Sequence, residues 1–174
     1  MRIEDIGRHA SDDVLRRARF GRLACALEGQ PYVTPISFAY DGDCIYGFST
    51  VGQKILWMRS NPLVCLEVEE LTSVQDWTTV VVTGKYEELP LSSENRKYRE
   101  HAYELLRRHP VWWEPGYVKT VVHGTDRPLE GIYFQIRIDK ISGRRGIPNS
   151  VPERMRPRVR NRIANWLQET FGRT

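Results

Sequence analysis

The sequence predicts a mainly β fold, a closed or half-closed antiparallel barrel with peripheral helices. One observation is that about six segments have the alternating or β-branched character of strands. Another is that short turns join the early segments in succession, which is the pattern of an antiparallel meander. In addition, the strand–helix alternation of a doubly wound parallel sheet is missing. The chain has 174 residues, of which 40% are hydrophobic, and this is enough for one domain with a sizeable core.

The meander is expected near the start of the chain. A short helix comes first, because Ser11 can cap it and Asp12 and Asp13 suit the positive end of its dipole. Further on, Asp41-Gly42 supplies the positive φ that a tight hairpin needs. The expected strands are 22–27, 32–40 and 44–49, with turns at 28–30 and 41–43.

The rest of the chain adds further strands and helices. Gly84 stands in a β-branched run, which predicts a bulge or the close approach of another group. We expect helices over 53–60, from Ser92 or Ser93 onward, and from Pro157 onward; strands over 63–71, 78–83 and 131–141; and a loop-like region over 110–130. The last helix is amphipathic, because its apolar residues recur on one stripe.

Composition excludes several classes of protein. No apolar run reaches the ~18 residues of a membrane span, so no membrane partner is expected. The net charge of +4 is concentrated in residues 137–174, which hold 10 Lys+Arg against 3 Asp+Glu. A basic block could meet nucleic acid, an anionic cofactor or a partner subunit. We do not expect nucleic-acid binding, because the rest of the chain is net negative and no stacking aromatics accompany the arginines.

The cysteines favour a reducing environment. There are 3, an odd number, and no pair has CxxC spacing. A disulfide scaffold and a cysteine zinc site are therefore not expected, and we expect no metal. The simplest location is the cytoplasm.

One segment has the chemistry of a phosphate site, although the usual catalytic motifs are absent. The hydroxyls of Ser49 and Thr50 end a strand, Gly52 permits close approach, and free backbone N–H groups open the next helix. Lys54 lies in the first turn, where the helix dipole disfavours a cation unless an anion is bound. The alternative is that Lys54 is a solvated surface lysine and that a hydroxyl merely caps the helix.

Two adjacent tryptophans, Trp112 and Trp113, lie in the loop-like region between prolines. Exposing both indoles is costly, so they either pack over the end of the barrel or line a pocket for a flat ring. The sequence leaves these two alternatives open.

A series of motifs then appears in a characteristic order. They are Gly21-Arg22-Leu23-Ala24; the run from Pro35 to Gly42; the run from Ile45 to Thr50; Gly52-Gln53-Lys54; Asn61-Pro62-Leu63-Val64-Cys65; Trp77 and the run from Thr79 to Gly84; and the run from Ile136 to Arg144. By order and spacing, this set resembles the pyridoxamine 5′-phosphate oxidase-like flavoproteins. The nearest branch is that of small nitroimidazole-resistance-like, flavin-nucleotide-binding proteins.

The resemblance implies a split β-barrel, formed by residues 1–146, that dimerises and binds FMN in clefts between its subunits. Residues 147–174 would form an Arg-rich helix packed on the barrel or on the partner. The implied cofactor-binding residues are Thr34, Pro35, Ile36 and Ser37 along the flavin ring; Ser49, Thr50, Gln53 and Lys54 at the phosphate; Trp77 and Thr79 at the ring; and Arg144 in the closing turn. A substrate pocket is expected near Trp112, Trp113 and Tyr117.

The implied function is an FMN-dependent oxidoreductase acting on a small molecule, with NAD(P)H as a candidate electron donor. The alternatives are a non-catalytic flavin-binding or sensor protein, and a deazaflavin- or haem-binding relative of the same fold. Oxidation of vitamin B6 itself is not expected, because the oxidases' basic residues for the substrate phosphate and their C-terminal tryptophan and arginine pattern are not evident.

Overall fold

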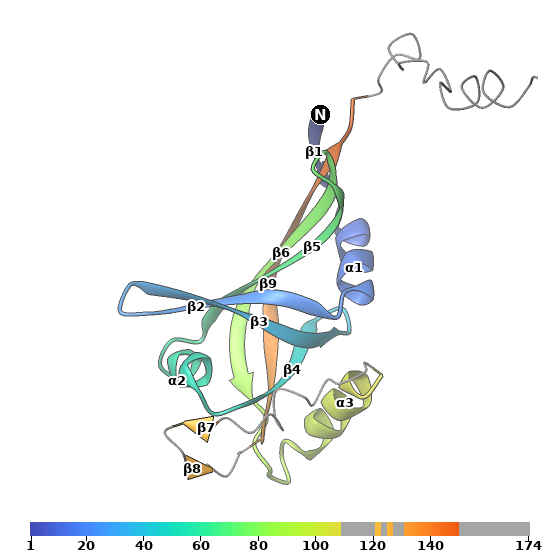
Figure 1. The fold of residues 1–174 in the computed structure, drawn as a ribbon. Coiled ribbons are helices and arrows are strands. Elements are labelled where there is room, and N and C mark those ends of the chain that lie inside the picture. The colour runs from blue at the N-terminus through green and yellow to red at the C-terminus, as the bar shows by residue number, and fades with distance from the viewer. Residues whose placement is uncertain (109–120, 123–124, 127–130, 150–174) are drawn as a thin grey trace, which may run out of the picture.

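The computed structural model describes residues 1–108, 121–122, 125–126 and 131–149. A seven-stranded antiparallel sheet forms the body of the protein, in the order β1-β9-β4-β3-β2-β5-β6 (Figure 1). Its strands are β1 (Arg2–Ile6), β2 (Phe20–Leu27), β3 (Gln30–Tyr40), β4 (Cys44–Thr50), β5 (Leu63–Ser73), β6 (Asp76–Glu88) and β9 (Gly131–Ile147). Because β6 also pairs with β9, all strands except β1 close into a barrel. The predicted mainly β, antiparallel fold is confirmed.

The long strand β9 is the seam of the barrel. One of its edges pairs with β6 over residues 134–146. The other edge is shared, because β4 pairs with residues 131–137 and β1 pairs with residues 143–147. Figure 1 shows the consequence: β1, β5, β6 and the end of β9 run together away from the body of the barrel.

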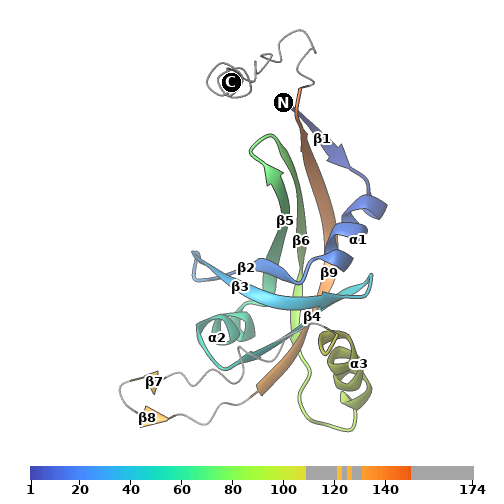
Figure 2. The same ribbon diagram turned by 45° about the vertical axis from the view of Figure 1, so that its right-hand side comes forward.

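Three helices pack against the strands in the described part of the chain: α1 (Arg8–Arg17), α2 (Gln53–Ser60) and α3 (Arg96–Leu106). α1 contributes Val14 and Leu15 to the main core, and α2 contributes Ile55 and Met58. α3 lies on the other side of the barrel from α2 (Figure 2). It packs through Ala102 in a second, smaller cluster. None of these helices is long and apolar enough to cross a membrane.

Much of the predicted element order is confirmed. The helix over 53–60 has the predicted bounds, and β2, β3 and β4 form the expected meander. The turn after β2 uses positive φ at Glu28 (51°) and Gly29 (82°), and the next turn uses Gly42 (112°). These are the conformations that two tight hairpins need.

The N-terminal prediction needs correction. The first strand, β1, was not predicted, because five residues that pair only with the far end of β9 leave little pattern in the sequence. Ser11 does not cap the first helix. That helix begins at Arg8, and the buried Ser11 hydroxyl donates a hydrogen bond to the Gly7 carbonyl at 3.1 Å.

Later elements also differ from their predicted bounds. α3 begins at Arg96 rather than at Ser92 or Ser93, because Ser92 Oγ accepts a hydrogen bond from the Asn95 amide at 3.2 Å and forms a turn ahead of the helix. The last strand continues beyond 141 to Ile147, where it pairs with β1 and β6. The region predicted as loop-like contains a small hairpin, β7 (Val121–Val122) and β8 (Thr125–Asp126). The expected helix from Pro157 lies outside the described residues.

Gly84 lies at a break in register, as predicted. Thr83 pairs with Lys140, whereas Gly84 pairs with Ile138, so Asp139 on β9 has no opposite residue. A Cβ atom on Gly84 would lie 2.2 Å from the carbonyl oxygen of Arg137. The bulge therefore brings two backbones together at a distance that only glycine permits.

We predict that Gly84→Ala lowers the free energy of unfolding by about 2 kcal/mol or more, since the clash is with backbone and no side-chain rotation relieves it. Urea unfolding of the two proteins measures the change. Gly52→Ala is the matched control, because its Cβ would meet nothing closer than 4.0 Å. Equal stability of Gly84→Ala and wild type would contradict the described close approach.

Candidate functional site

The site is organised by a split between β3 and β4. β3 is eleven residues long but pairs with β4 only over Phe38–Tyr40. Over its earlier part, residues 30–37, it pairs with β2 on one edge and has no β4 partner on the other. β4 meanwhile continues along β9 to Thr50 and leads into α2. Figure 2 shows the two strands diverging toward α2.

The residues predicted to lie along a flavin ring occupy this unpaired edge. Thr34 pairs with the buried Leu23, so its side chain shares the inward face, and Ile36 is 6% exposed within the core. Pro35 and Ser37 alternate with them and face outward. Ile36 can therefore reach a ligand only through its backbone. The edge as a whole offers backbone groups without a strand partner.

The start of α2 has the features of an anion site. Gly52 precedes the helix in an extended conformation, and among the described residues no side-chain hydrogen bond caps this end of the helix. The first turn contains no acidic residue. Thr50 is half-buried beside this turn, while Ser49 is 1% exposed and donates a hydrogen bond to the Thr50 carbonyl at 3.3 Å. Gln53 is exposed at the first helical position. An anion would satisfy the uncapped amides and the positive end of the dipole.

Lys54 has no carboxylate partner among the described residues. Burial lowers the pKa of its ammonium group below the ordinary value of 10.5. Within the described residues, the only titratable group that acts on it is the Cys25 thiol, which is buried and has its own pKa raised by burial. A half-buried cation without a carboxylate partner costs free energy in the ligand-free protein. This burial argues against a fully solvated surface lysine.

The other end of α2 is clamped to the barrel. Arg59 donates two hydrogen bonds to the Glu88 carboxylate at the end of β6, at 2.6 and 3.2 Å. The Tyr86 hydroxyl donates to the same carboxylate at 2.7 Å. The hydrogen bond from Arg59 is the main reason that the pKa of Glu88 lies below its usual value, while burial raises the pKa of Tyr86. On the opposite side, Trp57 packs edge-on against Tyr32 of β3, with ring centroids 5.7 Å apart. These contacts fix the helix that carries Lys54.

The remaining predicted cofactor residues form a second group on β6 and β9. Trp77, Thr79 and Arg144 line a hollow of about 730 Å³, together with residues of β1 such as Asp5. Thr79 and Arg144 are direct cross-strand neighbours. Arg144 forms an exposed ion pair with Asp5 at 3.4 Å. Asp5 was not predicted, because the strand that carries it was not.

A glycine on the neighbouring strand leaves room for the Trp77 side chain. Its cross-strand partner is Gly146, and a Cβ atom there would lie 2.5 Å from the indole Nε1. The indole thus lies across the backbone of β9 and is half-buried. The sequence contains a signal for this packing, since a glycine inside an otherwise continuous strand often marks a close approach.

The two groups occupy different parts of one chain. Cross-strand pairs place Pro35 beside Arg22, Arg22 beside Glu67, and Glu69 beside Thr79, so two strands separate the groups along the outward face. Trp112, Trp113 and Tyr117, predicted to line a substrate pocket, lie outside the described residues. Within the part of the chain that is described, no group of three or more His, Cys, Asp or Glu side chains could hold a metal ion.

Comparison with known proteins agrees with this fold. The family model described as pyridoxamine 5′-phosphate oxidase matches residues 7–145. The chain therefore belongs to the pyridoxamine 5′-phosphate oxidase family. An uncharacterized protein of Rhizobium meliloti (strain 1021) is 41% identical over 144 residues, which cover 83% of this chain and 95% of that protein.

Solved structures are similar over most of the chain. A FAD-binding protein from Mesorhizobium loti is 38% identical with a TM-score of 0.69, and the match covers 85% of this chain and 99% of that one. A candidate 5-nitroimidazole antibiotic resistance protein from Bacteroides thetaiotaomicron shares the fold at 21% identity, with a TM-score of 0.58 and coverage of 83% and 89%. The predicted family is thus confirmed.

Proposed function

We propose that this protein binds a flavin nucleotide, with the phosphate next to the flavin's ribityl chain at the start of α2. The observation that carries the proposal is Lys54, a half-buried ammonium without a carboxylate partner in the described residues, beside uncapped helix amides. FMN and FAD share this phosphate. The family resemblance implies FMN, and the Mesorhizobium loti relative is described as FAD-binding.

The chain's own residues suit such a ligand. Lys54 and the α2 amides would hold the phosphate, and the clamp between Arg59 and Glu88 keeps them in position. The unpaired edge of β3 would offer backbone hydrogen bonds to the polar rim of a flat ring. A bound flavin would supply hydride or electron transfer, while the protein supplies orientation and exclusion of water.

We predict that Lys54→Met weakens FMN and FAD binding about ten- to a hundredfold, because a charge-assisted hydrogen bond is worth roughly 1.5–3 kcal/mol. Riboflavin, which lacks the phosphate, should bind both proteins equally. Fluorescence titration of the three ligands measures this. The ligand-free variant should be at least as stable as wild type, since the substitution removes a half-buried charge for which the described residues provide no carboxylate partner. If Lys54→Met lowered riboflavin affinity as much as FMN affinity, the phosphate would have to bind elsewhere.

The same interaction should depend on pH. Binding of the phosphate requires protonated Lys54, and burial lowers the pKa of this group below 10.5. The preference for FMN over riboflavin should therefore fall at an alkaline pH below that value in wild type, and should show no such fall in Lys54→Met. Fluorescence titration of both ligands across this pH range measures the preference.

We further propose that the protein is an oxidoreductase acting on a small molecule. The purified protein should be yellow, and NADH or NADPH should bleach it under anaerobic conditions, with recovery of the colour when an acceptor such as a quinone or nitroaromatic is added. Colour that persists with both nicotinamides, although dithionite bleaches it, would favour a non-catalytic flavin-binding or sensor protein instead.

The outward face of the barrel supports a homodimer. Several large apolar side chains are exposed on this face, namely Phe20 (59%), Val33 (58%), Leu63 (59%) and Leu71 (67%). Apolar surface of this kind marks interaction sites. The edge of β3 and the group containing Trp77 lie on the same face but at separate places. A two-fold axis through the strands between them would bring the β3 edge of one copy next to the group containing Trp77 of the other.

This arrangement can be tested by complementation. Lys54→Met and Trp77→Ala homodimers should each bind flavin weakly. A mixed dimer can be isolated with two different affinity tags. It should regain one tight site, because one of its two sites then combines an intact Lys54 from one copy with an intact Trp77 from the other. Calorimetric stoichiometry measures the recovery. Mixed dimers that regain no tight site, or a 20.3 kDa monomer that binds flavin tightly, would contradict a shared site.

A further inference from the structure

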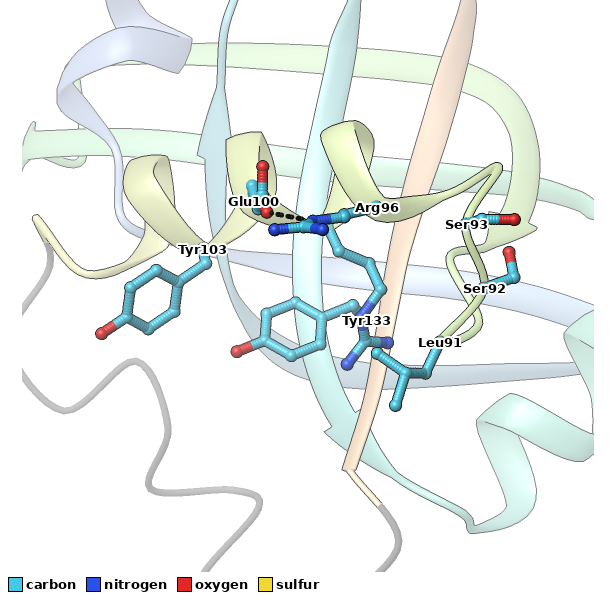
Figure 3. A pocket seen from close by; sticks show the side chains of 8 residues that line it. Leu91, Ser92, Ser93, Arg96, Glu100, Tyr103 and Tyr133 are labelled. Atoms are coloured by element: carbon cyan, nitrogen blue, oxygen red, sulfur yellow. Dashed lines mark hydrogen bonds and ion pairs between the residues drawn. The ribbon is translucent and has the colours of Figure 1, made fainter.

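A second hollow, of about 610 Å³, lies between α3 and β9 on the outer surface of the barrel (Figure 3). It is distinct from the hollow beside Trp77. Arg96, Arg99, Glu100 and Tyr103 come from one side of α3, because these positions recur at helical spacing. The other lining residues are Leu91, Ser92 and Ser93 before the helix and Tyr133 on β9.

The walls of this hollow are suited to a flat ring. Figure 3 shows the rings of Tyr103 and Tyr133 and the side chain of Leu91 projecting to the same side of α3. Leu91 is 89% exposed and Tyr103 is 44% exposed, so both present apolar surface to solvent. Aromatic side chains in such an opening provide stacking surfaces for a nucleobase.

The hollow also carries net positive charge. Arg96 is neutralised by Glu100, at 2.9 Å. Arg99 is not paired with a carboxylate in the described residues. Its guanidinium lies 4.6 Å from the centre of the Tyr133 ring and donates a hydrogen bond to the Leu89 carbonyl at 2.6 Å. An anion beside a flat ring would therefore find here one cation that no carboxylate of the described residues neutralises.

The hollow is connected to the proposed phosphate site along the sheet. Tyr133 pairs with Phe48, and their ring centroids are 4.8 Å apart. Thr50 lies two residues beyond Phe48 on the same side of β4, about 7 Å farther along the strand. It directly precedes the loop that opens α2. One outer face of β4 and β9 thus connects the start of α2 with the tyrosines.

We infer that this hollow binds an adenosine phosphate, with the purine against Tyr103 and Leu91 and the phosphate beside Arg99. The inference rests on the proposed flavin function for its biological setting, although the hollow itself is independent of the α2 site. Two sources would supply this chemistry. One is the adenylate half of FAD, and the other is a separate adenine dinucleotide acting as electron donor.

The experiment compares two tyrosines of α3. Tyr103 lines the hollow, whereas Tyr98, which is 54% exposed, faces a neighbouring depression and serves as the matched control. Calorimetric titrations of FMN, FAD and AMP are made with wild type, Tyr103→Ala and Tyr98→Ala. If the hollow binds the adenylate half of FAD, wild type should bind FAD at least about tenfold more tightly than FMN. Tyr103→Ala should remove this advantage and leave FMN unchanged, and Tyr98→Ala should alter neither.

The other outcomes are equally informative. A second outcome is that FMN and FAD bind with equal affinity, while AMP or NADPH binds to the FMN-loaded protein. If Tyr103→Ala weakens this AMP or NADPH binding about tenfold, the same site is supported, and its ligand is the separate dinucleotide. No FAD advantage and no AMP or NADPH binding at millimolar concentration would overturn the inference. Failure of all flavins to bind would refute the proposed function alone, since AMP binding and its loss in Tyr103→Ala would still test the hollow.

Discussion

The separation of β3 from β4 is the constraint on which the rest of the site depends. Had the two strands paired along their whole length, no backbone would be free beside Thr34–Ser37. The sequence supplies a reason for the split. Pro31 and Pro35 both lie in β3, and because they are four residues apart, the two missing N–H donors fall on the same edge of the strand. An edge that cannot complete a ladder is then available to a ligand.

The anchoring of α2 explains why a destabilising residue is tolerated in its first turn. Ile55 and Met58 are fully buried and anchor the helix in the core, while Arg59 fixes its end to Glu88. The first turn can therefore hold Lys54, which has no carboxylate partner in the described part of the chain, without losing its position. The proposed phosphate would offset the cost of burying this charge, and packing elsewhere in the same helix balances that cost in its absence.

Sequence reasoning succeeded where a single residue type had one physical explanation. Gly84 predicted the bulge and Asp41-Gly42 predicted the hairpin turn, because each position needs a backbone that other residues resist. It failed where structure depends on distant partners. The pairing of β1 with the end of β9 cannot be read from Arg2–Ile6, and the burial of Ser11 follows from how α1 meets Gly143. The position of Lys54 in the first turn of α2 was predictable from the sequence; the separation of Trp77 from it was not.

In the proposed homodimer, that separation would link cofactor binding to assembly. The outward face carries both proposed halves of the site, and between them Arg22 is held by Glu67 and Glu69 at 3.0 and 2.7 Å. Arg22 neutralises one of these two carboxylate charges within one chain, so one negative charge remains where a second copy would cover the surrounding apolar side chains. A ligand that contacts both copies binds the dimer and not the monomer. By mass action it must stabilise the dimer, and dilution of the protein must weaken its binding.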